Sequence, residues 1–384
     1  MTFQKVEINP KRVDYLLALY KMTPKELLSL LNEGRKKLLT KEVLFQKYMD
    51  LAILKRLDKI FEKGLSFYQD FTELPKKPES SVFFRKSQFG VKLNNETIKI
   101  VQQFETQKDL LDAYAKLTDL KLEIDIKPYS PTENPKAVAN KIRHLFIPDR
   151  RFSKSRELLV EMIKLCSERN IFVFEYVETW NKKNKSNIDG FFLRPNMIVL
   201  KRQKSYKREI FTLAHELGHC LLGIEEIEEL DVLNMNPHSL SNIERWCNDF
   251  AFYLIMGEQA QILDSISSVN EKNDYCYELV QELSEQTFIS RIAIYTRLLF
   301  DKKLSQKNYA LIKNDLDEQY TLRIKAEKEK NTNNKNNART PKPILSPLFI
   351  ETMQYALYKG VINEVTFCEK LKINPSNLNK YIVW

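Results

Sequence analysis

The segment TLAHELGHCLLG, residues 212–223, decides the fold of the middle of the chain. Its apolar residues recur at helical spacing and Gly223 stands where a helix commonly stops, so it predicts a helix that ends at Leu222. His215 and His219 lie four residues apart in this helix. That spacing puts both imidazoles on one face, where they can be directed at a single metal ion.

Glu216 directly follows the first histidine and indicates what the ion would be used for. In the pattern His-Glu-x-x-His the glutamate reaches a metal-bound water without ligating the metal. Zinc lowers the pKa of that water towards about 7, and Glu216 can take its proton as hydroxide attacks a carbonyl carbon. Two ordinary core histidines would instead leave unpaired polar groups in an apolar helix, at a cost of several kcal/mol. The pattern therefore predicts a Zn²⁺ cofactor and Glu216 as the catalytic base.

A second predicted helix offers the third protein ligand that a catalytic zinc requires. SNIERWCNDFAFYLIMG, residues 241–257, puts Glu244 and Asn248 on one side of that helix. Packed antiparallel to the first helix, it could present Glu244 to the ion and Asn248 to a ligand imidazole. Ser241 and Glu244 also fit a capping box, in which Glu244 would only bond to the start of its own helix. Spacing alone leaves both interpretations of Glu244 open.

Two further roles stay open at this level. The rival candidates for the third ligand are His238 and Asp231. The residues that could stabilise an oxyanion are Tyr206, Tyr253 and His238. The sequence does not decide among them, because their distances from the predicted ion depend on how the chain folds.

Length and composition are those of a globular protein with more than one domain. At 384 residues the chain exceeds the roughly 150 residues of a typical domain, and 43% hydrophobic residues supply a sizeable core. The N-terminus lacks the features of a signal peptide and no stretch has the about 20 apolar residues that cross a bilayer. We therefore expect a cytoplasmic protein with no membrane partner. The five cysteines never form Cys-x-x-Cys, which argues against a disulfide framework and a thiolate zinc site.

The net charge of +10 would suit a nucleic-acid partner, but the basic residues do not cluster. Lys and Arg are spread along the chain, and the densest run, at 323–343, is mixed with Asn and Glu as in a linker. A solvated basic surface explains the charge as well as a DNA-binding face does. DNA stays an open partner at this level.

The order of predicted elements gives a mostly helical α+β chain. Thr23 and Glu26 form a capping box in the N-terminal part, and KEVLFQKYMDLAILKRLDKIFEKG (41–64) has apolar residues at helical spacing. Strands are expected at 171–177 and 196–200. The predicted boundaries are 1–75 for an N-terminal helical module, 76–94 for a linker, 95–305 for the α+β domain, 306–345 for a helix and Lys/Asn-rich linker, and 346–384 for a small helical C-terminal module.

TLAHELGHCLLG followed by ERWCNDFAFYLIMG resembles the ImmA/IrrE family of zinc metallopeptidases, whose pattern is a helical H-E-L-G-H and a later E-x-x-x-N-x-F-A helix. The resemblance covers about residues 95–305 and implies a zincin-like metallopeptidase core. It also implies that Glu244 is the third zinc ligand. The strand that contains Met197, Ile198, Val199 and Leu200 would lie beside the active site.

The N-terminal segment INPKRVDYLLALYKMTPKELLSLL, continuing to VFFRK at 82–86, resembles the helix-turn-helix module often fused ahead of such peptidases. The stretch NEGRKKLLTKEVLFQKY lacks the Trp and Gly that usually precede the third helix of that module. A module that docks a protein therefore fits as well as one that reads DNA. Members of the family are similar to regulators that cleave or inactivate a partner repressor, which implies a protein substrate such as a repressor encoded nearby.

Two hypotheses follow. The first is a zinc-dependent endopeptidase, with zinc on His215, His219 and Glu244, Glu216 as the base, and a protein substrate laid along the strand at 196–200. The second is a DNA-binding transcriptional regulator with a structural or vestigial metal site. A structural zinc would normally have a fourth protein ligand and would need no carboxylate at position 216. The sequence therefore favours the endopeptidase.

Overall fold

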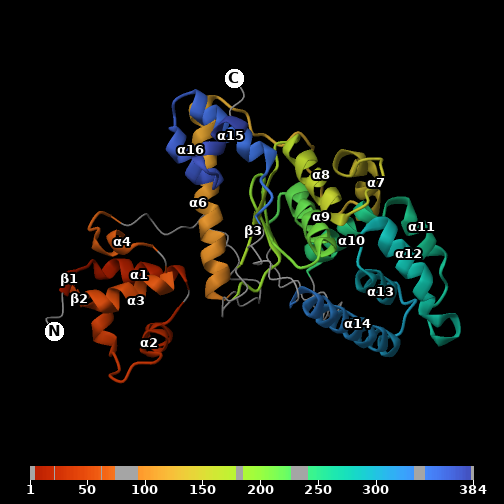
Figure 1. Cartoon of the computed structure of the whole chain (residues 1–384), viewed down its shortest axis with the longest axis horizontal. Coiled ribbons are helices and arrows are strands. Elements are labelled where there is room, and N and C mark those ends of the chain that lie inside the picture. The colour runs from red at the N-terminus through yellow and green to blue at the C-terminus, as the bar shows by residue number, and fades with distance from the viewer. Residues whose placement is uncertain are drawn as a thin grey trace. The chain divides into compact units, whose positions relative to one another are not determined.

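The structure, a computed structural model of the full chain, describes residues 5–20, 22–61, 63–73, 94–178, 185–225, 241–332 and 342–381. Two compact units make up the chain: Met1–Glu105 with Asn184–Asn187, and Thr106–Lys183 with Ile188–Trp384 (Figure 1). The described residues are mostly helical and their strands form two small sheets, which confirms the mostly helical α+β class. None of the helices in these ranges combines the length and apolar character needed to cross a bilayer.

The first unit joins short helices to a two-stranded ladder. Its elements are β1 (Lys5–Glu7), α1 (Pro10–Leu19), α2 (Pro24–Asn32), the 3-10 helix η1 (Lys41–Phe45), β2 (Tyr48–Asp50), α3 (Leu51–Phe61) and α4 (Leu65–Gln69). The capping box predicted for Thr23 and Glu26 is present at the start of α2. The helix expected over 41–64 is wrong in its first half, because β2 pairs with β1 and α3 begins only at Leu51. The segment 82–86 and most of the expected linker 76–94 lie outside the described residues, and the domain boundaries and helix-turn-helix interpretation stay predictions.

A three-stranded sheet belongs to the second unit. Its strands are β3 (Phe172–Tyr176), β4 (Gly190–Leu193) and β5 (Met197–Lys201), in the order β3-β5-β4. β5 pairs parallel with β3 and antiparallel with β4. Nearly all their side chains are buried, which explains why the strands are continuous apolar runs without polar alternation. The strands predicted at 171–177 and 196–200 are confirmed to within about one residue at each end.

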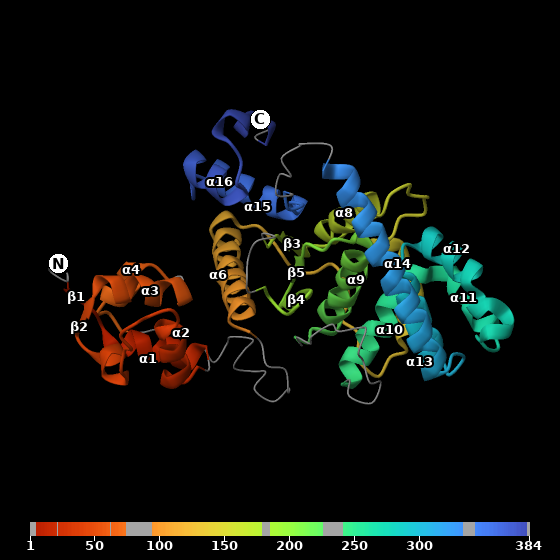
Figure 2. The ribbon, with the colours of Figure 1, turned by 60° about the horizontal axis from the view of Figure 1, so that its bottom comes forward.

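Helices of this unit pack around α9 (Tyr206–Leu222), which contacts β4, β5, α8 and α10 (Figure 2). The unit also contains the C-terminal part of α6 (Asn95–Thr118), α7 (Pro135–Phe146), α8 (Ser155–Ser167), α10 (Asn242–Met256), η2 (Gly257–Gln259), α11 (Ala260–Ser265), η3 (Glu271–Cys276), α12 (Tyr277–Thr287), α13 (Arg291–Phe300) and α14 (Gln306–Thr332). The predicted end of α9 is confirmed, with Gly223 at a φ of 62°. Because neighbours surround α9, almost all residues from Glu209 onward are buried.

The C-terminal helices belong to the same unit. They are α15 (Pro347–Tyr358), α16 (Glu364–Leu371) and the 3-10 helix η4 (Pro375–Lys380). The backbone N–H of Ile344 donates to Oε2 of Glu175 at 2.7 Å. The ring of Phe349 meets that of Phe174 edge-on, with centroids 5.1 Å apart. These contacts anchor the start of the C-terminal segment to β3.

Candidate metal centre

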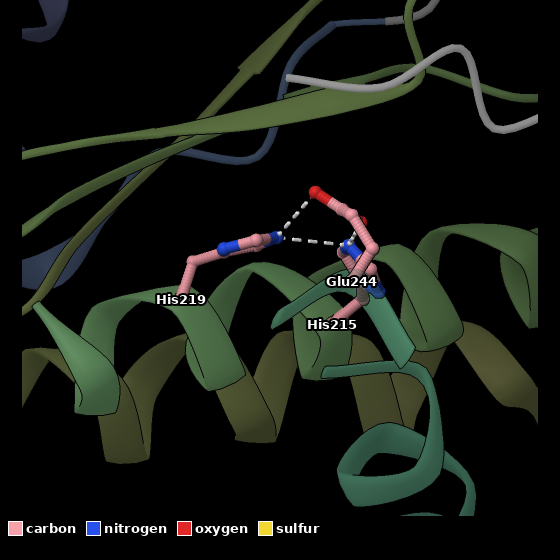
Figure 3. A group of neighbouring side chains, drawn as sticks. All are labelled: His215, His219 and Glu244. Carbon is pink, nitrogen blue, oxygen red and sulfur yellow. Dashed lines mark hydrogen bonds and ion pairs between the residues drawn. The ribbon is translucent and has the colours of Figure 1, made fainter. Parts of the chain in front are cut away.

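α9 and α10 bring together two histidines and a glutamate. His215 and His219 project from one face of α9, and Glu244 reaches them from the first turn of α10 (Figure 3). The two histidine Nε2 atoms are 3.1 Å apart. Oε2 of Glu244 lies 3.1 Å from Nε2 of His215, and Oε1 lies 3.2 Å from Nε2 of His219. The three residues predicted as ligands therefore form one group that could hold a metal ion.

The separations within this group fit a zinc ion. Nitrogen and oxygen ligands lie about 2.0–2.1 Å from zinc, so two ligands at a tetrahedral angle are about 3.3 Å apart. The measured separations of 3.1 and 3.2 Å are close to that value. Glu244 is only 1% exposed, and neither carboxylate oxygen has a hydrogen-bond donor in good geometry. A buried carboxylate is costly unless a positive charge lies beside it, and a metal ion at the centre of the group or a proton on an imidazole supplies that charge.

Asn248 orients one of the two imidazoles. Its Oδ1 lies 3.0 Å from Nδ1 of His215, so the hydrogen bond predicted between Asn248 and an imidazole is present. Because an amide oxygen only accepts, neutral His215 carries its proton on Nδ1 and donates it to Asn248. Nε2 then keeps its lone pair and faces Glu244 and His219, as a metal ligand requires.

Without a metal ion, the group holds a proton instead. Burial alone would lower the pKa of His215, but the carboxylates of Glu244 and Glu216 outweigh burial and raise it to about 9. Burial alone would raise the pKa of Glu244, but the two imidazoles outweigh burial and hold it well below its usual range. Metal binding at neutral pH must therefore displace a proton from His215.

Gly218 lets α10 come close enough for Glu244 to reach the histidines. A Cβ atom at position 218 would lie 3.2 Å from Sγ of Cys247 and 3.3 Å from its Cα and Cβ. Cys247 follows Glu244 by three residues on α10. A larger residue at this crossing would press α10, and Glu244 with it, away from α9. The glycine thus sets the helix spacing that the group needs.

Glu216 lies on the side of α9 that faces the sheet. A Cβ atom on Gly190, the first residue of β4, would come within 3.3 Å of Cγ of Glu216 and 2.6 Å of Cγ2 of Thr212. β4 therefore packs directly on this part of α9 because Gly190 has no side chain. Glu216 is 3% exposed, and its charge contributes to the raised pKa of His215. Glu216 is thus close to the metal-ligating group without being one of its three members.

Ser241 caps α10, whereas the side chain of Glu244 is used elsewhere. Oγ of Ser241 accepts a hydrogen bond from the backbone N–H of Glu244 at 3.0 Å. The carboxylate of Glu244 lies against the imidazoles and not against the helix N-terminus. Of the two interpretations that the sequence left open, this geometry favours the metal ligand.

The tyrosines considered for an oxyanion have other partners. Tyr206 precedes the first histidine by nine residues, which is about 13 Å along the helix axis, and its hydroxyl accepts a hydrogen bond from Arg202. The hydroxyl of Tyr253 accepts from Nη2 of Arg297 at 2.9 Å. Neither tyrosine joins the metal-ligating group. The remaining candidates, His238 and Asp231, lie outside the described residues.

The strand expected to hold a substrate is already paired on both sides. β5 contacts α9, but β3 and β4 occupy its two edges. A substrate laid along residues 196–200 could therefore not pair with this strand through the backbone, since a central strand has no free backbone groups to offer. β4 has β5 on one side and no second strand among the described residues on the other. β4 is not predictable from the sequence pattern, because GFFL is only four residues long and carries no alternation.

Comparison with known sequences gives an independent assignment. Residues 166–298 match the family model described as the IrrE N-terminal-like domain, of peptidase family M78. The matched range includes all three members of the metal-ligating group and Glu216. Neither the curated proteins nor the solved structures gave a match.

Proposed function

The chain carries a metallopeptidase domain of the IrrE N-terminal-like family, and on this premise we propose that it is a zinc-dependent endopeptidase. His215, His219 and Glu244 would hold the zinc ion, and Glu216 would be the general base. The observation that carries the proposal is the convergence of three buried side chains, whose two Nε2 atoms and two carboxylate oxygens approach one another at 3.1 and 3.2 Å. Their side chains have no other evident reason to meet in an apolar core.

The roles of the residues follow from their positions. A zinc ion in such a site supplies Lewis-acid chemistry that makes water a competent nucleophile near neutral pH. Glu216 accepts the proton of the attacking water and later returns it to the leaving amine. Asn248 keeps the imidazole of His215 turned towards the ion. Gly190 keeps β4 against Glu216 and limits the space in which its carboxylate can move.

A protein substrate would pair with β4 and not with β5. In an antiparallel pair, alternate residues direct their N–H and C=O groups away from the partner strand, and β4 has no described strand on that side. An extended peptide added there would continue the sheet by backbone hydrogen bonding. Because Gly190, the first residue of β4, packs against Glu216, the added strand would bring a peptide bond towards the general base. The sequence resembles regulators that cleave a partner protein. We therefore propose a repressor encoded nearby as the substrate.

The alternative, a transcriptional regulator with a structural or vestigial metal site, has less support. In the described residues, the metal-ligating group contains three members and no fourth protein ligand. A structural zinc would normally be closed by a fourth ligand. The matched family is also one of peptidases.

Glu216→Gln tests the proposal, because it removes the base and leaves the three ligands in place. Turnover should fall by at least about 10²-fold to 10⁴-fold, since an amide cannot accept the proton. Zinc content should stay at the wild-type level. The measurement is cleavage of the neighbouring repressor candidate during co-expression, followed on a gel, with elemental analysis of the same preparations.

Glu209→Gln is the matched control on the same helix. Glu209 is 1% exposed, and burial together with the neighbouring Glu175 raises its pKa well above its usual range, which favours the protonated form. Gln resembles a protonated glutamate, and this variant should cleave like the wild type. Wild-type cleavage by zinc-loaded Glu216→Gln protein would refute the mechanism.

A further inference from the structure

Four residues from the middle of the chain belong to the first unit. The segment Asn184–Asn187 groups with Met1–Glu105, whereas the chain on both sides of it belongs to the second unit. The crossing after Asn187 lies three residues before Gly190, the first residue of β4. The strand proposed to pair with a substrate therefore begins directly beyond a segment that the first unit holds.

Hydrogen bonds from the start of α6 hold this segment. Oγ1 of Thr97 donates to Oδ1 of Asn187 at 2.8 Å and accepts from the backbone N–H of Asn187 at 3.0 Å. The backbone N–H of Asn94 donates to the same Oδ1 at 3.2 Å, and Nδ2 of Asn94 donates to the carbonyl of Lys185 at 2.7 Å. Thr97 is 0% exposed, so its bonds are shielded from water and costly to lose.

The local structure of α6 fixes the position of Thr97. Oδ1 of Asn94 accepts from the backbone N–H of Thr97 at 2.9 Å, and the carbonyl of Asn94 accepts from the N–H of Ile98 at 3.1 Å. Asn94 thus caps the start of the helix. Because threonine is β-branched, its side chain has few rotamers in a helix. Oγ1 of Thr97 is therefore a defined anchor point for Asn187.

The short path from Asn187 to β4 has fixed partners. Ile188 is buried, and its carbonyl accepts from the hydroxyl of Tyr176 at 3.3 Å. Oδ1 of Asp189 accepts from Nε2 of Gln203 at 2.7 Å. Three residues span at most about 10 Å, so the chain has little slack between the anchor and the strand. The position of Asn187 therefore bears directly on the position of the first residue of β4.

We propose that Thr97 and Asn187 are positioning residues of the peptidase, which hold the start of β4 in place for an incoming peptide. The inference rests on the proposed function, in which a substrate adds to the free side of β4. A strand that is already ordered binds with a smaller loss of conformational entropy. Because both residues belong to the first unit, that unit controls substrate binding through the backbone and not through the zinc ligands.

Hydrogen–deuterium exchange of the full-length, zinc-loaded protein, followed by mass spectrometry, tests the positioning without a substrate. Thr97→Val keeps the shape of the side chain and removes the hydroxyl that bonds to Asn187. The protected amides at 188–193 should exchange about 5-fold to 100-fold faster, because a buried hydrogen bond is lost. Amides of β3, at 172–176, should keep their wild-type rates, which separates a local release from a loss of global stability. Thr97→Ser keeps the hydroxyl and should exchange like the wild type.

Thr118→Val is the matched control on the same helix. The hydroxyl of Thr118 is also buried, but it donates to the carbonyl of Tyr114 within α6, at 2.8 Å. This variant should leave exchange at 188–193 unchanged. Asn187→Ala should act like Thr97→Val, and the double variant should add little, since both changes remove the same bonds. Wild-type exchange at 188–193 in both Thr97→Val and Asn187→Ala would overturn the proposal, because the bonds would then serve only the start of α6.

Cleavage kinetics with the purified repressor candidate test the consequence for substrate binding. Thr97→Val should raise KM about tenfold, since a misplacement of about 1 Å far from the chemistry can cost 10²-fold. The value of kcat should change less than about threefold, because the zinc ligands and Glu216 lie on α9 and α10. An unchanged KM in a variant whose β4 exchanges faster would overturn the role in substrate binding. Failure of the wild-type protein to cleave the candidate would count against the proposed function, whereas exchange at 188–193 would still decide whether Thr97 and Asn187 hold β4.

Discussion

Replacing Gly218 by alanine should lower zinc affinity although residue 218 is not itself a ligand. The added Cβ would lie 3.2 Å from Sγ and 3.3 Å from Cα and Cβ of Cys247, closer than ordinary van der Waals contact. Sγ can rotate away, but Cα belongs to the backbone of α10. The helix must therefore move by a few tenths of an ångström. Glu244 stands less than one turn from Cys247 on the same helix and moves with it.

The size of the effect follows from the tolerance of metal sites. Distances in a zinc site hold to within about 0.2 Å, so a movement of a few tenths of an ångström exceeds that tolerance. We expect the zinc affinity to weaken about tenfold, which is ~1.4 kcal/mol of binding free energy. This is the low end of the losses seen when residues that support the metal ligands are changed. Stability of the metal-free protein should change less, because alanine gains up to about 1 kcal/mol over glycine inside a helix and offsets part of the crowding.

A competition titration with a chromophoric chelator at pH 7.5 measures the zinc affinity, and thermal unfolding of the metal-free protein measures stability. The double variant Gly218→Ala with Cys247→Ala removes the nearest atom, Sγ, and should recover part of the affinity. Cys247→Ala alone is the control. Wild-type affinity in Gly218→Ala would show that this crossing does not hold Glu244 in place.

Further outcomes concern the ligands, their support and pH. The chain should bind about one zinc ion, and alanine at His215 or His219 should abolish stoichiometric metal in elemental analysis. Glu244→Ala should weaken zinc binding markedly. Ser241→Ala should lower the free energy of unfolding by about 1 kcal/mol and leave zinc binding unchanged. If instead Glu244→Ala kept the metal and Ser241→Ala lost it, Glu244 would not be a zinc ligand. Asn248→Ala should weaken zinc binding about 10-fold to 100-fold in the same titration. Because the pKa of His215 rises from 6.5 to about 9 on folding without metal, metal-free stability should be greatest below pH 6.5 and fall towards pH 9 in urea unfolding. Zinc affinity should rise over the same interval, since a metal competes with that proton, and a flat profile of both would contradict a proton held by His215.

Local periodicity was enough to predict the two helices that carry the candidate site, α9 and α10. A helix turns once every 3.6 residues, so the spacing of His215 and His219 fixes their shared face before any tertiary contact forms. The end of α9 at Gly223 and the cap at Ser241 rest on hydrogen bonds between residues near in sequence. The same reasoning failed over 41–64, because pairing between β1 and β2 is a contact with a distant segment that periodicity cannot reveal.

Tertiary structure decided what the sequence had left open. Whether the carboxylate of Glu244 bonds to its own helix or to the imidazoles depends on how closely α10 crosses α9 at Gly218. Which strand lies at an edge depends on β4, which is too short to be recognised by pattern but pairs with β5 and packs on Glu216. The partners of the tyrosines considered for the oxyanion were likewise not predictable from the sequence, since Tyr206 bonds to Arg202 and Tyr253 to Arg297. Helical spacing is set by hydrogen bonds four residues apart, whereas the choice of partner across helices and strands is set by packing between segments far apart in the chain.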